Sequence, residues 1–172
     1  MNVDTHINRA SVQGIALFEG LQPDEVDDVL RTATSRRYAA GDRVFEQGEN
    51  ARQFFVLLHG RLRVTQVTSE GQQIAIRMVN PGDLFGIAKA LCRLDYPGTA
   101  TAVSDSVALA WPMSVWDEFL ERHPALALGA MQTIGSRLLE AQQRLRELST
   151  EEVERRVAHA VLRLANQSGK RE

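Results

Sequence analysis

Five glycines recur at short intervals in the middle of this chain and constrain its fold more than any other feature. They punctuate residues 35–112, a stretch of short runs rich in Val, Ile, Phe and Thr, at Gly41, Gly48, Gly60, Gly71 and Gly82. The intervals of 7, 12, 11 and 11 residues are typical of short strands joined by tight turns in an all-β sandwich or barrel. This segment therefore predicts a β-roll of about eight strands.

Two of the predicted strands are expected to pair as a hairpin across Glu70-Gly71. In each strand, apolar or long side chains alternate with polar or small ones, as in a strand with one face buried. The side chains expected to face inward are Leu62, Val64, Gln66, Ile74, Ile76 and Met78.

Helices are predicted on both sides of the β segment. Residues 12–34 are expected to be helical in two pieces broken at Gly20, and Pro23 followed by two acidic residues favours the start of the second piece. A further short helix is predicted over residues 112–120, with Trp116 and Phe119 as packing residues. The roll is thus expected to carry a small N-terminal helical cap.

The segment that begins at His123-Pro124 carries a coiled-coil repeat. Its apolar residues are spaced 4, 3, 4, 3, 4, 3, and they are Ala127, Met131, Ile134, Leu138, Ala141, Leu145 and Leu148. A helix of roughly 25 residues spans about 37 Å, too long to be covered by a small β-roll alone. We expect a second copy of the chain to cover it, with an interface formed by Met131, Ile134, Leu138, Ala141 and Leu145.

Three regions are expected along the chain: residues 1–122 as the β-roll domain with its helices, 123–148 as the dimerisation helix, and 149–172 as the start of another domain. Ser149 to Glu152 has the composition of a helix start, and the helix predicted there ends near Ser168-Gly169. Because nothing follows Glu172, we expect this last domain to be truncated.

Composition excludes several classes of protein. The chain has 44% hydrophobic and 24% charged residues, a formal net charge of -2 and a pI of about 6.1, so it lacks the basic excess of a nucleic-acid binder. A single cysteine, Cys92, rules out an all-cysteine metal cluster within one chain and is expected to be a buried small hydrophobe. No signal segment or long apolar run is present, which predicts a cytoplasmic protein without membrane partners.

The order of these elements resembles the Crp/Fnr family of bacterial transcription regulators, the cyclic-AMP receptor type, over essentially the whole chain. The segments that carry the resemblance are Leu17-Phe18 with Leu21, Tyr38 to Gly48, Phe55 to Gly60, Gly71 to Gly86, Asp105-Ser106 before Trp111-Pro112, and Glu152 to Ala158. The resemblance implies an α+β fold: an antiparallel β-roll, or double-stranded β-helix, of the cyclic-nucleotide-binding type, with an N-terminal helical cap and a long C-terminal dimerisation helix. It also implies that the roll binds an effector, that the long helices form a homodimer, and that a winged helix-turn-helix domain beyond Glu172 reads DNA.

The resemblance places the effector pocket at Phe85, Gly86, Ile87, Ala88, Thr99, Ala100 and Thr101. Cyclic-nucleotide binding in this family uses a glutamate for the ribose hydroxyl, and an arginine with a small hydroxyl residue for the phosphate. Here the glutamate position is Ile87 and the arginine position is Gly98, so only Thr99 remains among the polar ligands. Arg93 would reach the pocket only if its loop were reshaped. We therefore expect a cyclic nucleotide to bind weakly or not at all.

An apolar pocket suits haem or another largely hydrophobic small molecule. The resemblance is nearest to nitric-oxide-responsive members, some of which use haem, whereas Gly86 and Ala88 replace the Cys and His ligands of the carbon monoxide sensors. No axial ligand or metal ligand can be named: we expect all four histidines, His6, His59, His123 and His159, to have structural roles.

Of three alternative functions, the first is excluded, the second is disfavoured and the third remains open. A cupin-like metalloenzyme is excluded because only His59 lies in the β region, so no enzyme activity is expected. A cyclic-nucleotide-binding regulatory domain of a kinase or channel lacks its arginine here and leaves the long helix unexplained. A stand-alone dimeric small-molecule sensor would have the same sequence pattern without any DNA-binding domain.

Overall fold

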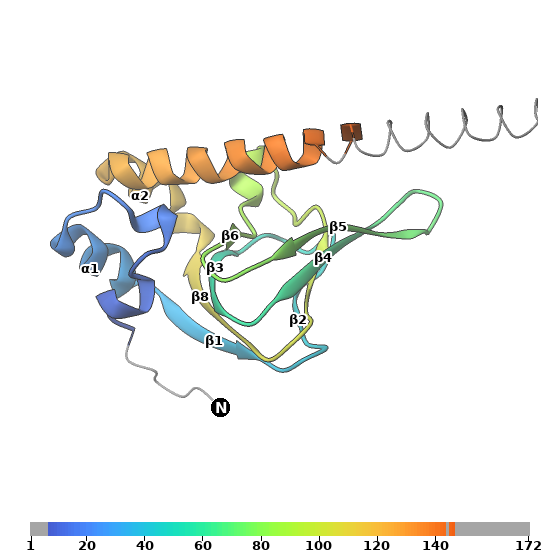
Figure 1. Cartoon of the computed structure of the whole chain (residues 1–172), viewed down its shortest axis with the longest axis horizontal. Helices are drawn as coiled ribbons and strands as arrows, with labels where there is room; N and C mark the ends of the chain where they lie inside the picture. Colours follow the sequence, from blue (N-terminus) through green and yellow to red (C-terminus); the bar gives the residue numbers. More distant parts are fainter. Residues whose placement is uncertain (1–6, 144, 147–172) are drawn as a thin grey trace, which may run out of the picture. The chain divides into compact units, whose positions relative to one another are not determined.

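The computed structural model describes residues 7–143 and 145–146. It contains an N-terminal helical cap, two four-stranded antiparallel sheets that form a roll, and helices after the last strand (Figure 1). The predicted α+β fold with an antiparallel β-roll is confirmed. Contacts divide the chain after Thr133, and the cap and the roll lie in the first of the two units.

The cap consists of three short helices. They are η1 (Arg9–Val12), η2 (Ala16–Phe18) and α1 (Pro23–Arg31). The Gln22 amide just before α1 donates to the Glu25 carboxylate at 2.7 Å, and Pro23 occupies the first helical position, where no amide hydrogen is needed. The buried residues of this helix are Val26, Val29 and Leu30, which lie on one face at i, i+3 and i+4.

The eight strands divide between two sheets, and every neighbouring pair is antiparallel. The first sheet has the order β1-β8-β3-β6, with β1 (Thr34–Tyr38), β8 (Ser106–Pro112), β3 (Gln53–His59) and β6 (Leu84–Phe85). The second has the order β2-β7-β4-β5, with β2 (Arg43–Phe45), β7 (Thr99–Ala102), β4 (Leu62–Val67) and β5 (Gln73–Val79). The core lies between the sheets, because both contribute buried apolar side chains to one cluster.

The turn at Gly60 illustrates why glycines punctuate this fold. Its φ is 87°, in the left-handed region that favours glycine. A Cβ at Gly60 would also collide with Ser106 and with the Asp105 carbonyl oxygen. The glycine therefore allows the β3–β4 turn to lie directly against the start of β8.

The β4–β5 hairpin forms as predicted, with Leu62 opposite Val79 and Val67 opposite Gln73. The predicted facing of its side chains is partly wrong. Ile74, Ile76 and Met78 are exposed, and Thr65 is buried in place of Gln66. A register shift at Val64/Thr65 disturbs the alternation, and β5 is the edge strand of its sheet, so apolar residues there are not forced inward.

A second apolar layer joins the first sheet to the cap. Phe54 of β3 stacks on Trp111 of β8 with ring centroids 5.5 Å apart and meets Trp116 edge-on at 4.9 Å. The Trp111 indole nitrogen donates to the Val29 carbonyl of α1 at 2.8 Å. Trp116 therefore has the packing role predicted for it, and Trp111 packs as well. Trp116 begins α2 (Trp116–Arg122), which follows η4 (Met113–Val115).

The segment after α2 is helical over residues 124–143, as predicted. His123 precedes it and is buried, with Nε2 3.1 Å from Asp28 Oδ2 and Nδ1 3.5 Å from Glu25 Oε1. Its predicted structural role at the helix entry is confirmed.

No helix of the described part is both long enough and apolar enough to cross a membrane. Leu148 and the predicted helix within residues 149–172 lie outside the described residues.

Candidate functional site

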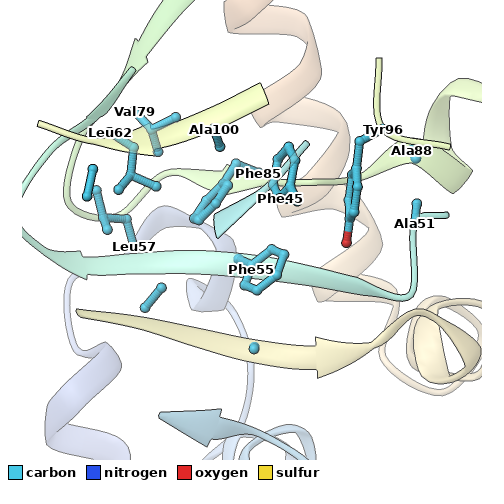
Figure 2. Close-up of a cluster of buried hydrophobic side chains, with 13 residues drawn as sticks. Phe45, Ala51, Phe55, Leu57, Leu62, Val79, Phe85, Ala88, Tyr96 and Ala100 are labelled. Carbon is cyan, nitrogen blue, oxygen red and sulfur yellow. The ribbon is translucent and has the colours of Figure 1, made fainter. Parts of the chain in front are cut away.

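Four aromatic rings occupy the interior of the roll. Phe45 lies between the others, with ring centroids 3.9 Å from Tyr96, 5.9 Å from Phe55 and 6.2 Å from Phe85 (Figure 2). The Phe45 and Tyr96 rings are nearly parallel, at 15°. Phe45 comes from one sheet, and Phe55 and Phe85 come from the other. The rings therefore join the two sheets through apolar contacts.

Tyr96 comes from a loop rather than a strand, and backbone hydrogen bonds fix its position. Its amide donates to the Glu49 carbonyl at 2.9 Å, and its carbonyl accepts from the Gly48 amide at 2.9 Å. The Ala51 amide donates to the Leu94 carbonyl at 2.8 Å. The loop before β7 is thus held along the segment before β3, and the Tyr96 side chain is only 3% exposed.

The Tyr96 hydroxyl completes the hydrogen bonding of Gln53 at the start of β3. It donates to the Gln53 carbonyl at 2.7 Å and accepts from the Gln53 amide at 3.2 Å. β6 pairs with β3 only at Phe55 and Val56, so no strand reaches Gln53 on this edge. Burial raises the pKa of Tyr96, while the hydrogen bond to the Gln53 backbone acts in the opposite direction.

The structure brings together four of the seven predicted pocket residues. Phe85, Ala88 and Ala100 belong to the same buried cluster as Phe45 and Tyr96. Gly86 lies against this cluster with a φ of 71°, and a Cβ there would be 2.9 Å from the Phe55 ring. At this position glycine is needed for both backbone geometry and space.

The other three predicted residues are arranged differently. Ile87 is buried just before η3 (Ala88–Leu91). Thr99 and Thr101 alternate along β7 with the buried Ala100, which places them on the opposite face of that strand, and both are half-buried. The Thr99 hydroxyl accepts a hydrogen bond from the Gln47 amide at 3.0 Å. The assignment of these residues to an effector pocket stays a prediction.

No cationic side chain can occupy position 98. A Cβ at Gly98 would lie 2.7 Å from the Thr65 carbonyl oxygen and 3.3 Å from Val64 Cγ1. Arg93 is exposed, and its guanidinium is paired with Asp95 at 3.0 Å. Among the described residues, the buried polar or charged ones are Thr65, Ser106 and His123, so no lysine or arginine is buried in the roll. Without such a partner, burial of an anion is strongly disfavoured.

The described histidines and the cysteine do not supply a ligand for a haem in the roll. His59 is exposed at the end of β3, both ring nitrogens of His123 face carboxylates, and Cys92 is exposed, so none of them presents a ligand to the apolar interior. The expectation that Cys92 is buried was wrong, because it ends η3 in the left-handed region, with φ 54°. His6 and His159 lie outside the described residues. Within residues 7–143, 145 and 146, no group of three His, Cys, Asp or Glu side chains is arranged to hold a metal ion.

Comparison with protein families identifies the roll. The family model described as "Cyclic nucleotide-binding domain" matches residues 35–123, which run from β1 through α2. Among curated proteins, the cyclic AMP receptor protein of Thermus thermophilus is 33% identical over 156 residues, which cover 91% of this chain and 72% of that protein.

Two solved structures extend the comparison. The catabolite activator protein of Thermus thermophilus superposes with a TM-score of 0.68 at 33% identity, covering 88% of this chain and 71% of that one. The sensor domain of the transcriptional regulator DNR from Pseudomonas aeruginosa superposes with a TM-score of 0.65 at 27% identity, covering 78% of this chain and 90% of that one. The likeness thus spans most of the described residues.

Sequence reasoning did not place Phe45, Gln53 or Tyr96 in the site. Phe45 could have been found from the sequence as the aromatic member of the apolar pair Val44-Phe45, which stands between Arg43 and Glu46. The partnership of Gln53 and Tyr96 joins residues 43 positions apart, and no local pattern marks it. The sequence marks Tyr96 only as an aromatic residue within its loop.

Replacing Tyr96 with Phe tests the hydroxyl. Near pH 7.5 we expect Tyr96→Phe to lower the free energy of unfolding by about 1–2 kcal/mol, because the Gln53 peptide group loses its partner. Since burial raises the pKa of Tyr96, the folded state binds the phenol proton more tightly than the unfolded state. The stabilisation of the folded state by the protonated Tyr96 hydroxyl is present below pH about 10. It is lost as the pH rises through the pKa of Tyr96 in the folded state.

Urea unfolding of both proteins between about pH 8 and about pH 11 measures this effect. The stability difference between them should shrink as the pH rises. Tyr38, whose pKa burial also raises, is present in both proteins and cancels in the comparison. A difference that stays constant or grows with pH would show that the Tyr96 hydroxyl does not stabilise the fold in its neutral form.

Proposed function

This chain belongs to the family of cyclic nucleotide-binding domains, in the Crp/Fnr branch of transcription regulators, and from that premise we propose that it senses an uncharged apolar effector rather than a cyclic nucleotide. It is the sensor and dimerisation region of such a regulator. Of the relatives that match over 91% of this chain, one is named a cyclic AMP receptor protein and another a cAMP-activated global transcriptional regulator.

One observation carries the proposal: the site has no charged group for a cyclic phosphate. The resemblance puts the arginine of cyclic-nucleotide sites at Gly98, where a Cβ has no room beside the Thr65 carbonyl. It puts the ribose-binding glutamate at Ile87, which is buried and apolar. Burying a phosphate without a cationic partner costs far more than apolar contacts return.

The likeness to a cyclic AMP receptor does not carry its ligand over to this chain. An identity of 33% supports a shared fold and a shared place for the effector, whereas the ligand depends on a few side chains. In this chain those side chains are aromatic or small, which favours a ligand with an apolar surface.

A haem-based response to nitric oxide was the more specific expectation from the sequence. Its support is the resemblance to nitric-oxide-responsive members, and the DNR sensor domain adds a likeness of fold. No described histidine or cysteine faces the interior, so the roll offers the iron of a haem neither an imidazole nor a thiolate. The proposal is restricted to an apolar organic effector.

The helix of residues 124–143 supports the proposed homodimer through its exposed apolar side chains. Met131 is 68% exposed, Leu138 is 60% exposed, and Leu145 beyond it is 65% exposed. Ile134 is half-buried and Ala141 is exposed. Leucines exposed to this extent on one helix are unfavourable in water unless another surface covers them, and the heptad spacing favours a second copy of the same helix.

In this proposal, effector binding in the roll changes the pairing of the two long helices around Met131 to Leu145. The DNA-binding domains of the two copies, reached through residues beyond Leu148, would then change their separation or orientation. Such coupling is a shift between two states of the dimer, and it requires that the effector bind one state more tightly than the other.

Calorimetric titration with cyclic AMP tests the choice of effector class. We expect this chain to bind cyclic AMP no more tightly than a Kd of about 1 mM, because Gly98 and Ile87 offer no charged group at the two positions where the family binds the phosphate and the ribose. The cyclic AMP receptor of Thermus thermophilus, titrated under the same conditions, is the positive control. Micromolar binding by this chain would contradict the proposal.

Sedimentation equilibrium of Leu138→Asp tests the dimer. A carboxylate at the centre of the helix pair should raise the dimer dissociation constant by at least roughly 100-fold, since each tenfold change needs only about 1.4 kcal/mol. Ser136→Asp is the matched control: it adds the same charge two residues away, on the opposite side of the helix, and should leave the constant within about threefold. Equal dimerisation of the two variants would refute the predicted interface.

A further inference from the structure

The Tyr96 ring lies in a slot whose walls differ in chemistry. One wall is the face of Phe45, 3.9 Å away between ring centroids. The small side chains of Ala51 and Ala88 lie near the ring in Figure 2. The end of the slot is the Gln53 peptide group, which offers one donor and one acceptor to the Tyr96 hydroxyl. The slot is therefore complementary to a flat phenol.

The residue that fills this slot belongs to an exposed loop. Leu91 is 52% exposed and Leu94 is 87% exposed, and residues 91–94 are all classed as exposed. Tyr96 is not part of any strand, and it is followed by Pro97 and Gly98 before β7 begins. Withdrawal of its side chain would break the stacking on Phe45 and two hydrogen bonds, but no strand pairing within either sheet. A larger movement of the loop would also break the Tyr96 backbone bonds to Gly48 and Glu49.

We propose that this slot is the effector site, and that it binds an uncharged planar aromatic molecule carrying a hydroxyl group, which enters by replacing the Tyr96 ring. The inference rests on the proposed function, in which the roll senses an apolar effector. Such a molecule would re-form the contacts that Tyr96 loses. The free-energy cost of the exchange is therefore mainly the ligand's loss of translational and rotational freedom.

The chemistry of the slot sets its specificity. A ligand without a hydroxyl would leave the Gln53 amide and carbonyl buried without partners, which carries a larger penalty than the loss of an exposed hydrogen bond. A charged ligand would find no compensating group, because no lysine, arginine, aspartate or glutamate is buried among the described residues. The site thus selects phenols over both plain hydrocarbons and anions.

Displacement of Tyr96 also reaches the following helix. The loop begins at η3, whose Lys89 ammonium pairs with the Asp117 carboxylate on α2. α2 leads through His123 into the helix that begins at residue 124. If the loop moves, the ion pair between Lys89 and Asp117 can transmit the movement to α2, which precedes the long helix.

Fluorine NMR of the whole chain labelled with 3-fluorotyrosine tests the exchange, because the sequence contains only two tyrosines, Tyr38 and Tyr96. The probe is p-cresol, which is the tyrosine side chain without its backbone. Tyr96→Phe assigns the two resonances. We expect p-cresol to move the Tyr96 resonance to the position of an exposed fluorotyrosine and to leave the Tyr38 resonance in place.

Toluene and cyclic AMP are the matched ligand controls. Toluene should displace Tyr96 only at concentrations at least about tenfold higher than p-cresol, because it cannot bond to Gln53. A Tyr96 resonance that p-cresol leaves unmoved, or that toluene moves equally well, overturns the inference. If cyclic AMP moves it at micromolar concentration, the proposed function itself fails, so the two failures are distinguishable.

The variant Tyr96→Ala provides an independent measurement. With the competing ring removed, the slot is always available, and calorimetry should show p-cresol binding at least about tenfold more tightly than in the wild type. An unchanged affinity would mean that p-cresol binds elsewhere. The wild-type NMR titration does not depend on this variant, and it decides the question if Tyr96→Ala does not fold.

Discussion

The stacking of Tyr96 on Phe45 is the contact on which the interior of the roll depends. Phe45 belongs to one sheet and contacts Phe55 and Phe85 of the other, so the aromatic cluster holds the two sheets together. Tyr96 closes the cluster at its loop end and supplies hydrogen bonds where β6 is too short to pair with Gln53. Stability of the roll and occupation of the proposed effector site therefore depend on the same few side chains.

The turns, the strands and the helices could be predicted because local chemistry determines them. Gly60 adopts a left-handed φ against the start of β8, and Pro23 with Glu25 begins α1. The facing of Ile74 could not be predicted, since a register shift in β4 and the edge position of β5 both arise from pairing. For the same reason the exposure of Cys92 depends on the path of its loop rather than on its neighbours in sequence.

The candidate site was predicted only in part. Phe85, Gly86, Ala88 and Ala100 were named from the sequence and lie in or against the interior cluster. The direction of the Tyr96 side chain is set by contacts with Glu49 and Gln53, more than 40 residues earlier in the chain, and no periodic pattern reports such contacts. The effector class that we propose follows from these long-range contacts more than from any motif.

Amide chemical-shift mapping of the isotopically labelled chain tests most directly whether the roll recognises an uncharged aromatic ligand. The account predicts that p-cresol shifts the amide resonances of Gln53 and Tyr96, whose groups line or fill the slot, while cyclic AMP leaves those of Gly98 and Thr99 unmoved. Shifts at Gly98 and Thr99 with micromolar cyclic AMP, and none at Gln53 with p-cresol, would contradict it.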